Sequence, residues 1–207
     1  MNKVLVTQRI DHISDYEEKR DSIDQRWTNF LMEIGLFPIF ASNNINHVKA
    51  ILKNEDIKGI ILTGGGNLSK YGGIDSERDQ LESFLLDWAI NSKTTLLGVC
   101  RGMQVLQDNF GLTLYNINNH VGIRHKLTVN QGFRMSKLIN SFKDVNSFHN
   151  LGTENSCISL PVVATSQDNI VMALEHETED IYGVMWHPER ENPFKDKDQE
   201  LFKYLFC

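Results

Sequence analysis

The chain has 207 residues, of which 41% are hydrophobic and 23% are charged, and its formal net charge is −6. This length suits one domain with a sizeable core, while the negative charge argues against non-specific nucleic-acid binding, which needs a positive field. No apolar run approaches the roughly 20 residues of a membrane helix, the N-terminus lacks the apolar core of a signal peptide, and three cysteines are too few for a disulfide framework. We therefore expect a single cytoplasmic domain over residues 1–207, with no nucleic-acid or membrane partner.

Short apolar runs alternate with helical patterns in the first half of the chain. The predicted strands are Lys3–Thr7, Phe37–Ala41, Ile57–Leu62 and Thr94–Val99. Apolar residues at helical spacing predict helices from about Tyr16 to Gly35, around Val48–Leu52, from Ser76 to about Asn91, and from Cys100 to Gly111. Ser76 and Asp79 have the spacing of a capping box. Strands that are apolar throughout and alternate with helices predict a parallel sheet covered on both faces.

The pattern changes after residue 112, where short β-like runs are separated by turn-rich pieces. The runs are Leu112–Tyr115, Lys126–Val129, Ser156–Ala164, Ile170–Leu174 and Ile181–Met185. A final helix is predicted from about Asp196 to Phe206. The expected fold is therefore α/β, with a mostly parallel sheet flanked by helices and antiparallel strands added in the C-terminal half.

Cys100 lies between Gly98 and Gly102, after a buried strand and before a helix. This is the pattern of a nucleophile elbow, in which glycines two residues on either side relieve a sharp turn. The helix N-terminus favours thiolate over thiol, and the backbone N–H of Arg101 would face a developing oxyanion. A buried structural cysteine is the commoner state of free cysteine, and it is our interpretation of Cys157 and Cys207. The strand, both glycines and the helix together favour a nucleophile at Cys100.

A cysteine nucleophile needs a base, and one of the seven histidines has suitable surroundings. His187 follows a predicted strand and is separated from Glu189 by Pro188. Residues two apart in extended chain project to the same side, so the Glu189 carboxylate can orient the His187 imidazole. Cys100, His187 and Glu189 therefore have the residue types of a nucleophile, a base and an orienting acid.

Together, Gly98–Gln104 and Trp186–Glu189 resemble the class I glutamine amidotransferase-like hydrolases, and more closely their γ-glutamyl hydrolase branch, which is similar to peptidase C26. Three further segments extend this resemblance over nearly the whole chain: Ile61–Gly66, Ser76–Asp79 and Val145–Asn150. The residue after Gly66 is Asn67, where many relatives carry proline.

The resemblance implies hydrolysis of a small γ-glutamyl conjugate through a thioester on Cys100, without a cofactor. It implies Gly65 and Arg101 as oxyanion donors. It assigns binding of the glutamyl group to Gln104, Ser147, Phe148 and His149. Short members of this branch occur with bacterial surface-polysaccharide genes, which implies a γ-glutamyl nucleotide amidate, such as γ-glutamyl-CDP-amidate in capsule phosphoramidate synthesis.

Two other functions remain open from the sequence. A glutaminase subunit of a two-component amidotransferase would need a synthetase partner, because the chain has no room for a synthetase domain. A non-catalytic redox sensor or binding protein would need Cys100 but has no evident use for His187 and Glu189. The sequence is also compatible with a homodimer.

Several charged residues and histidines have no assigned role. Gly64–Lys70 matches neither phosphate-binding glycine motif. The spacing of His120, His125 and His149 matches no compact ligand motif, so no metal site is expected. Solvated loop positions are the preferred interpretation of His120, Arg124 and His125. Arg9 and Arg78 lie near the edge of the predicted sheet where parallel sheets bind ligands, and their roles stay open.

Overall fold

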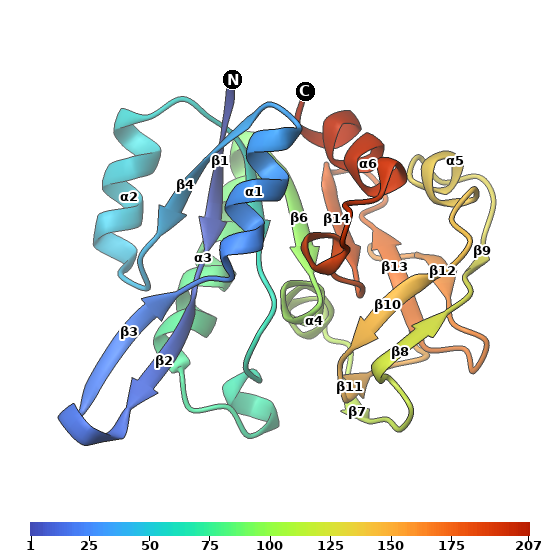
Figure 1. The fold of residues 1–207 in the computed structure, drawn as a ribbon, viewed down its shortest axis with the longest axis horizontal. Coiled ribbons are helices and arrows are strands. Elements are labelled where there is room, and N and C mark those ends of the chain that lie inside the picture. Colours follow the sequence, from blue (N-terminus) through green and yellow to red (C-terminus); the bar gives the residue numbers. More distant parts are fainter.

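A computed structural model describes residues 1–207 and contains a central eight-stranded sheet (Figure 1). In sheet order the strands are β4 (Leu36–Ala41), β1 (Asn2–Thr7), β5 (Ile57–Leu62), β6 (Thr95–Val99), β14 (Ile181–Val184), β13 (Val171–Glu175), β12 (Val162–Thr165) and β9 (Thr128–Val129). The first five are parallel, and the pairs from β14 to β9 are antiparallel. This confirms the predicted fold class.

Six α-helices cover the sheet or its extension: α1 (Gln25–Glu33), α2 (Ile45–Asn54), α3 (Ser76–Ser92), α4 (Arg101–Asn109), α5 (Ser136–Ile139) and α6 (Asp196–Phe206). Helices α1 and α6 lie side by side on one face (Figure 1), where the rings of Phe30 and Phe202 meet edge to face with centroids 4.9 Å apart. Helices α3 and α4 pack together on the opposite face. No helix is long and apolar enough to cross a membrane.

The helix predicted from Tyr16 is wrong in its first part. Two antiparallel strands, β2 (Arg9–Ile13) and β3 (Glu18–Ser22), form a hairpin here, joined by the 3₁₀ helix η1 (Ser14–Tyr16). Residues 17–21 are all exposed and therefore offer no apolar face to pack as a helix. Helix α1 begins only after Asp24, whose carboxylate accepts a hydrogen bond from the Arg26 N–H at 3.0 Å.

The predicted capping box is also wrong. Asp75 stands at the N-cap of α3 and Ser76 is already the first helical residue. The Asp79 carboxylate instead accepts a hydrogen bond from the backbone N–H of Ser69 at 2.8 Å, which ties the 3₁₀ helix η2 (Ser69–Tyr71) to α3.

Four short strands form two small sheets beside the main one. They are β7 (Tyr115–Asn116) paired with β11 (Leu151–Gly152), and β8 (Val121–His125) paired with β10 (Val145–Phe148). The sequence did not predict β8, because four of its five residues are exposed and show no alternation of apolar and polar positions. The strand expected over Ser156–Ala164 is shorter, since only β12 at its end pairs with the sheet.

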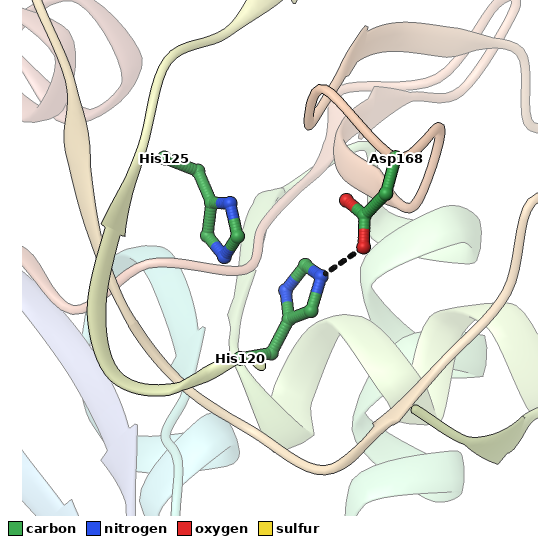
Figure 2. A group of neighbouring side chains, drawn as sticks. All are labelled: His120, His125 and Asp168. Atoms are coloured by element: carbon green, nitrogen blue, oxygen red, sulfur yellow. Dashed lines mark hydrogen bonds and ion pairs between the residues drawn. The ribbon is translucent and has the colours of Figure 1, made fainter. Parts of the chain in front are cut away.

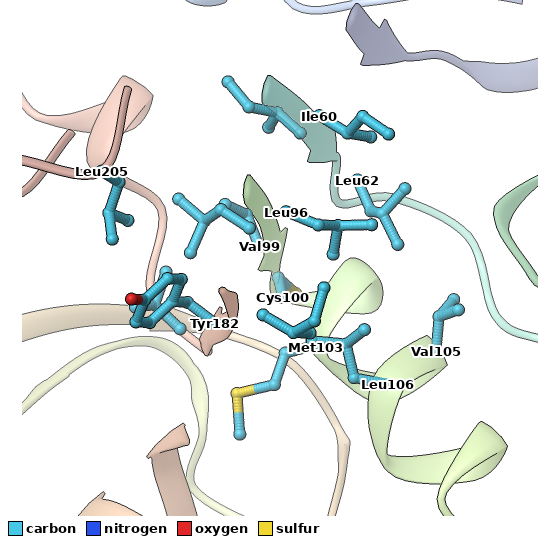
Figure 3. Packing of buried hydrophobic residues seen from close by; sticks show 14 of the residues in the cluster. Ile60, Leu62, Leu96, Val99, Cys100, Met103, Val105, Leu106, Tyr182 and Leu205 are labelled. Atoms are coloured by element: carbon cyan, nitrogen blue, oxygen red, sulfur yellow. The ribbon is translucent and has the colours of Figure 1, made fainter. Parts of the chain in front are cut away.

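The carboxyl ends of the parallel strands meet at one edge of the sheet, which is where open α/β sheets bind ligands. Cys100 follows β6 there and sits directly on the hydrophobic core (Figure 3). Val99, Met103 and Leu62 belong to the same buried cluster. The core therefore fixes the position of this cysteine from below.

Candidate active site

Cys100 has a strained backbone at the turn from β6 into α4. Its φ of 53° and ψ of −103° lie outside the regions that non-glycine residues usually occupy, which costs roughly 1–3 kcal/mol. Its N–H donates to the Val184 carbonyl at 2.8 Å. A Cβ on Gly98 would lie 2.5 Å from Gly102, and one on Gly102 would lie 2.1 Å from the Leu62 carbonyl oxygen. Both positions therefore require glycine for the turn to form.

His187 lies at the end of β14, and Glu189 lies in the 3₁₀ helix η3 (Pro188–Arg190) that follows. The His187 Nδ1 and a Glu189 carboxylate oxygen are 2.6 Å apart, and both side chains are buried. Burial opposes a charge on His187, but the neighbouring Cys100 and Glu189 outweigh it and raise the pKa of His187 to about 10. The imidazole is thus held in a position and an environment that favour its protonated form.

Gly64 shows how closely Cys100 and His187 approach each other. A Cβ on Gly64 would lie 2.6 Å from the His187 Cε1 and 3.5 Å from the Cys100 Cβ. Cys100 and His187 also line the same cavity. The structure therefore brings Cys100, His187 and Glu189 together, as predicted from three separate segments of sequence.

Asn146 on β10 fixes the backbone of His187 from both sides. Its Oδ1 accepts from the His187 N–H at 2.8 Å, and its Nδ2 donates to the His187 carbonyl at 2.8 Å. The Phe148 ring packs edge-on against the imidazole, with centroids 5.9 Å apart. The sequence analysis did not assign this role to Asn146, because strand β10 and its pairing were not predicted.

Arg78 organises the loop that follows β5. Its guanidinium donates to the carbonyl oxygens of Thr63, Gly64 and Gly65 at 2.8, 3.3 and 2.6 Å. The N–H of a trans peptide points opposite to its C=O, so the amides of Gly64, Gly65 and Gly66 point away from Arg78. The role of Arg78, left open by the sequence, is therefore to fix the orientation of the peptide groups in the loop that lines a cavity together with Cys100.

Glu82 neutralises Arg78 in the interior. Its carboxylate accepts from Arg78 Nε at 2.9 Å, from Thr7 Oγ1 at 2.8 Å, and from the guanidinium of Arg101, which also bonds Asp79. Burial favours the neutral acid, but the Arg101 and Arg78 charges outweigh it and lower the pKa of Glu82. One carboxylate thus links Arg78 to Arg101, the residue that follows Cys100.

Cys100 lines a cavity of about 290 Å³. Its walls are formed by Gly65, Gly66, Asn67, Cys100, Arg101, Gln104, Phe148, His149, Asn150, His187 and Arg190. A second cavity of about 330 Å³ lies against the hairpin and α1. It is lined by Arg9, Asp11, Ser22, Ile23, Asp24, Trp27, Thr63, Gly64, Gly65, His187, Glu189 and Arg190. The two cavities share Gly65, His187 and Arg190.

Three of the four residues predicted to bind the glutamyl group line the first cavity: Gln104, Phe148 and His149. Gln104 donates to the Leu151 carbonyl at 3.0 Å. Ser147 is buried outside the cavity, and its hydroxyl donates to the His120 carbonyl at 2.7 Å. The sequence analysis missed Arg190, which lines both cavities and lies over the Phe148 ring at 4.8 Å. The feature of the sequence that could have indicated Arg190 is its position directly after Glu189.

The comparisons with known proteins agree with this geometry. The chain has a TM-score of 0.73 to a putative GMP synthase subunit from Thermoplasma acidophilum, at 19% identity and covering 100% and 92% of the two chains. A glutamine amidotransferase from Thermotoga maritima has a TM-score of 0.64, at 15% identity and with 98% and 83% covered. The fold is therefore that of the class I glutamine amidotransferases.

The family is narrower than the fold class. The model of the Peptidase C26 family matches residues 4–189, and the chain belongs to this family of hydrolases. It is 32% identical over 190 residues to the γ-glutamyl-CDP-amidate hydrolase of Campylobacter jejuni, covering 90% of each chain. It is also 28% identical over 146 residues to a glutamine-hydrolysing GMP synthase subunit of Methanococcus aeolicus, covering 70% and 72%.

Proposed function

We propose that the protein hydrolyses the γ-glutamyl amide bond of a small conjugate, with Cys100 as nucleophile, His187 as acid and base, and Glu189 as the residue that orients His187. The observation that carries this proposal is the strained Cys100 beside a buried His187–Glu189 pair at the mouth of a cavity. A structural cysteine needs neither the strain nor the pair.

The reaction has two halves. The Cys100 sulfur attacks the γ-carbonyl carbon, and the C–N bond breaks as protonated His187 gives its proton to the leaving nitrogen. The amine departs and leaves a thioester. Neutral His187 then takes a proton from water, which attacks the thioester and releases glutamate and the Cys100 thiolate. Glu189 holds the Nδ1 proton of His187 throughout.

The oxyanion of each half is stabilised by backbone amides. We assign one donor to the Arg101 N–H, at the N-terminus of α4. The second is the N–H of Gly65, whose loop Arg78 holds through three carbonyls. Gln104, Phe148 and His149 form the wall where the glutamyl group binds. Ser147 can take part in that binding only through its backbone, because its hydroxyl faces His120.

For the leaving group we propose a nucleotide amidate, as in γ-glutamyl-CDP-amidate, with a role in surface-polysaccharide synthesis. The relative from Campylobacter jejuni that carries this name matches over nine-tenths of both chains. The second cavity supports a polar leaving group, because only two of its twelve lining residues are hydrophobic. Arg9, which pairs with Asp11, and Arg190 on its wall provide guanidinium donors for phosphoryl oxygens.

A second function is favoured by the likeness to the GMP synthase subunit of Methanococcus aeolicus. Under it the chain hydrolyses glutamine and delivers ammonia to a synthetase. The two functions differ in their substrate and in their need for a partner.

The deciding experiment measures glutamate release from glutamine, γ-glutamyl-aminobutyrate, a γ-glutamyl peptide and a γ-glutamyl nucleotide amidate. We expect fast turnover of the nucleotide amidate, none with Cys100→Ala, and a mass increase of one glutamyl group on trapped wild-type protein. Turnover of glutamine alone, stimulated by a synthetase, would establish the second function. Full activity of Cys100→Ala would refute both.

A further inference from the structure

Three side chains with metal-binding atoms converge beside the small sheet of β8 and β10. His120 precedes β8, His125 ends it, and Asp168 lies in the turn between β12 and β13 (Figure 2). One ring nitrogen of each histidine and one carboxylate oxygen of Asp168 all lie within 4.8 Å of one another. Asp168 was not among the candidate ligands that the sequence suggested.

The hydrogen bonds around His120 determine where its protons lie. The neighbouring His149 is buried. Its Nδ1 faces the Leu151 carbonyl at 3.0 Å and must donate, which in a singly protonated ring leaves its Nε2 as an acceptor. That Nε2 lies 3.2 Å from the His120 Nδ1, so His120 Nδ1 is the donor of this pair.

Because His120 Nδ1 carries the proton, an acceptor nitrogen of His120 faces the acceptor carboxylate of Asp168. In neutral His120 the second nitrogen, Nε2, carries a lone pair, and it lies 3.0 Å from the Asp168 carboxylate (Figure 2). Two acceptors at this distance repel each other unless a proton or a cation lies between them. The other Asp168 oxygen accepts from the Ser166 hydroxyl at 2.5 Å, so no donor is available there to relieve the contact.

His125 supplies a second, independent observation. Its ring stacks on that of His120 with centroids 4.1 Å apart. Its Nε2 is buried and has no hydrogen-bond partner, in a residue only 9% exposed. Leaving a polar atom buried without a partner costs about 1–3 kcal/mol.

We propose that His120, His125 and Asp168 bind one divalent metal ion of the zinc type. Two imidazole nitrogens and one carboxylate oxygen suit Zn²⁺, whose bonds to such ligands are about 2.0–2.2 Å. Asp168 can complete the site, because its side chain is 53% exposed and its Oδ2 already lies 3.0 Å from the His120 Nε2. The ion removes the acceptor–acceptor contact and satisfies the His125 Nε2. It revises the expectation from sequence that the chain has no metal site.

The ion would act on the active site only indirectly. Metal on His120 Nε2 fixes the proton on Nδ1, which donates to His149. His149 in turn lines the cavity that contains Cys100. The metal therefore joins the turn of Asp168 to the wall of that cavity, as a positioning element and not as a reagent.

The test is calorimetric titration of chelator-treated protein with Zn²⁺. All variants carry Cys100→Ala, because a cysteine beside a histidine is itself a zinc-binding pair. This background also makes the result independent of the proposed hydrolysis. We expect one ion per chain, with binding weakened at least tenfold by Asp168→Asn and by His125→Gln. Bound Co²⁺ should show the intense visible absorption of a four-coordinate site, lost in both variants.

Matched controls are Asp87→Asn on α3 and His47→Gln on α2, which lie outside the cluster and should bind Zn²⁺ as the parent does. Asp168 is exposed, so its variant should fold normally, and far-ultraviolet circular dichroism checks this. No stoichiometric binding at micromolar Zn²⁺, or equal affinity in Asp168→Asn and the parent, overturns the proposal. A doubly protonated His120 in the presence of Zn²⁺, seen by ¹⁵N nuclear magnetic resonance, does so as well.

Discussion

Replacing Glu189 by glutamine tests the proposed chemistry most directly. The two side chains have the same shape, so the change removes one buried charge and leaves the packing intact. The glutamine amide can also donate to the His187 Nδ1, which Glu189 now faces at 2.6 Å. That bond would move the imidazole proton to Nε2 and favour the tautomer that cannot accept a proton from Cys100.

The expected size of the effect follows from this contact. Two unit charges about 4 Å apart interact by about 4 kcal/mol at an effective dielectric constant of about 20, or about 3 pKa units. The pKa of His187 is about 10 in the wild type, where the charges of Cys100 and, after it, Glu189 outweigh burial. Removing the Glu189 charge should therefore lower this pKa, while the Cys100 charge keeps part of the shift. The lower pKa and the unproductive tautomer of His187 together should reduce kcat/KM about 10²–10⁴-fold.

The assay is glutamate release between pH 5 and pH 10.5 for the wild type, Glu189→Gln and the control Glu200→Gln, an exposed change on α6. The activity of the wild type should decline only above about pH 9, where His187 loses its proton. In Glu189→Gln the alkaline decline should begin at a lower pH, by at most about 3 units. An unchanged pH profile together with wild-type turnover would refute the role of Glu189.

Three further changes test the framework of the site. Glu82→Gln removes the charge partner of buried Arg78 and should lower the free energy of unfolding, measured in urea, by about 3–5 kcal/mol. The control Asp87→Asn, at an exposed position, should lower it by about 0.5 kcal/mol or less. Equal free energies of unfolding for the two variants would contradict this account. Gly102→Ala places a Cβ 2.1 Å from the Leu62 carbonyl oxygen. It should lower the free energy of unfolding by about 1–3 kcal/mol and the rate of glutamate release at least tenfold. Wild-type turnover of this variant would show that the turn tolerates a side chain. Burial is the main reason that the pKa of Asp198 rises to about 7 from 3.8, so the native state should lose stability as pH rises between these values. Asp198→Asn keeps the acceptor for Trp186 Nε1, which lies 2.9 Å away in the wild type. The variant should therefore have a higher Tm than the wild type at pH 8, and the two Tm values should differ less at pH 5. A lower Tm of the variant at both pH values would show that the buried Asp198 charge does not destabilise the wild type.

The parallel half of the fold could be predicted because its strands and helices have strong local patterns. Ile57–Leu62 and Thr95–Val99 are short apolar runs, and both are nearly or fully buried where the structure places them as β5 and β6. The turn at Cys100 could also be predicted, because Gly98 and Gly102 stand at the two positions where a side chain would clash.

The rest depends on contacts between distant segments. The β2–β3 hairpin is charged and exposed, so nothing in its periodicity separates it from a surface helix. Asn146 meets His187 across 41 positions of sequence, and Asp168 meets His120 across 48. Neither pair lies within a motif, so only the paired strands of the folded chain reveal them.

The Glu82 carboxylate has a mechanical consequence. It binds Arg101, the residue after Cys100, and through Arg78 it reaches the loop of Gly64 and Gly65. A displacement of either part is therefore transmitted to the other through two buried ion pairs. A substitution at Glu82 should accordingly disturb the proposed nucleophile and the proposed oxyanion donors together, although Glu82 touches neither.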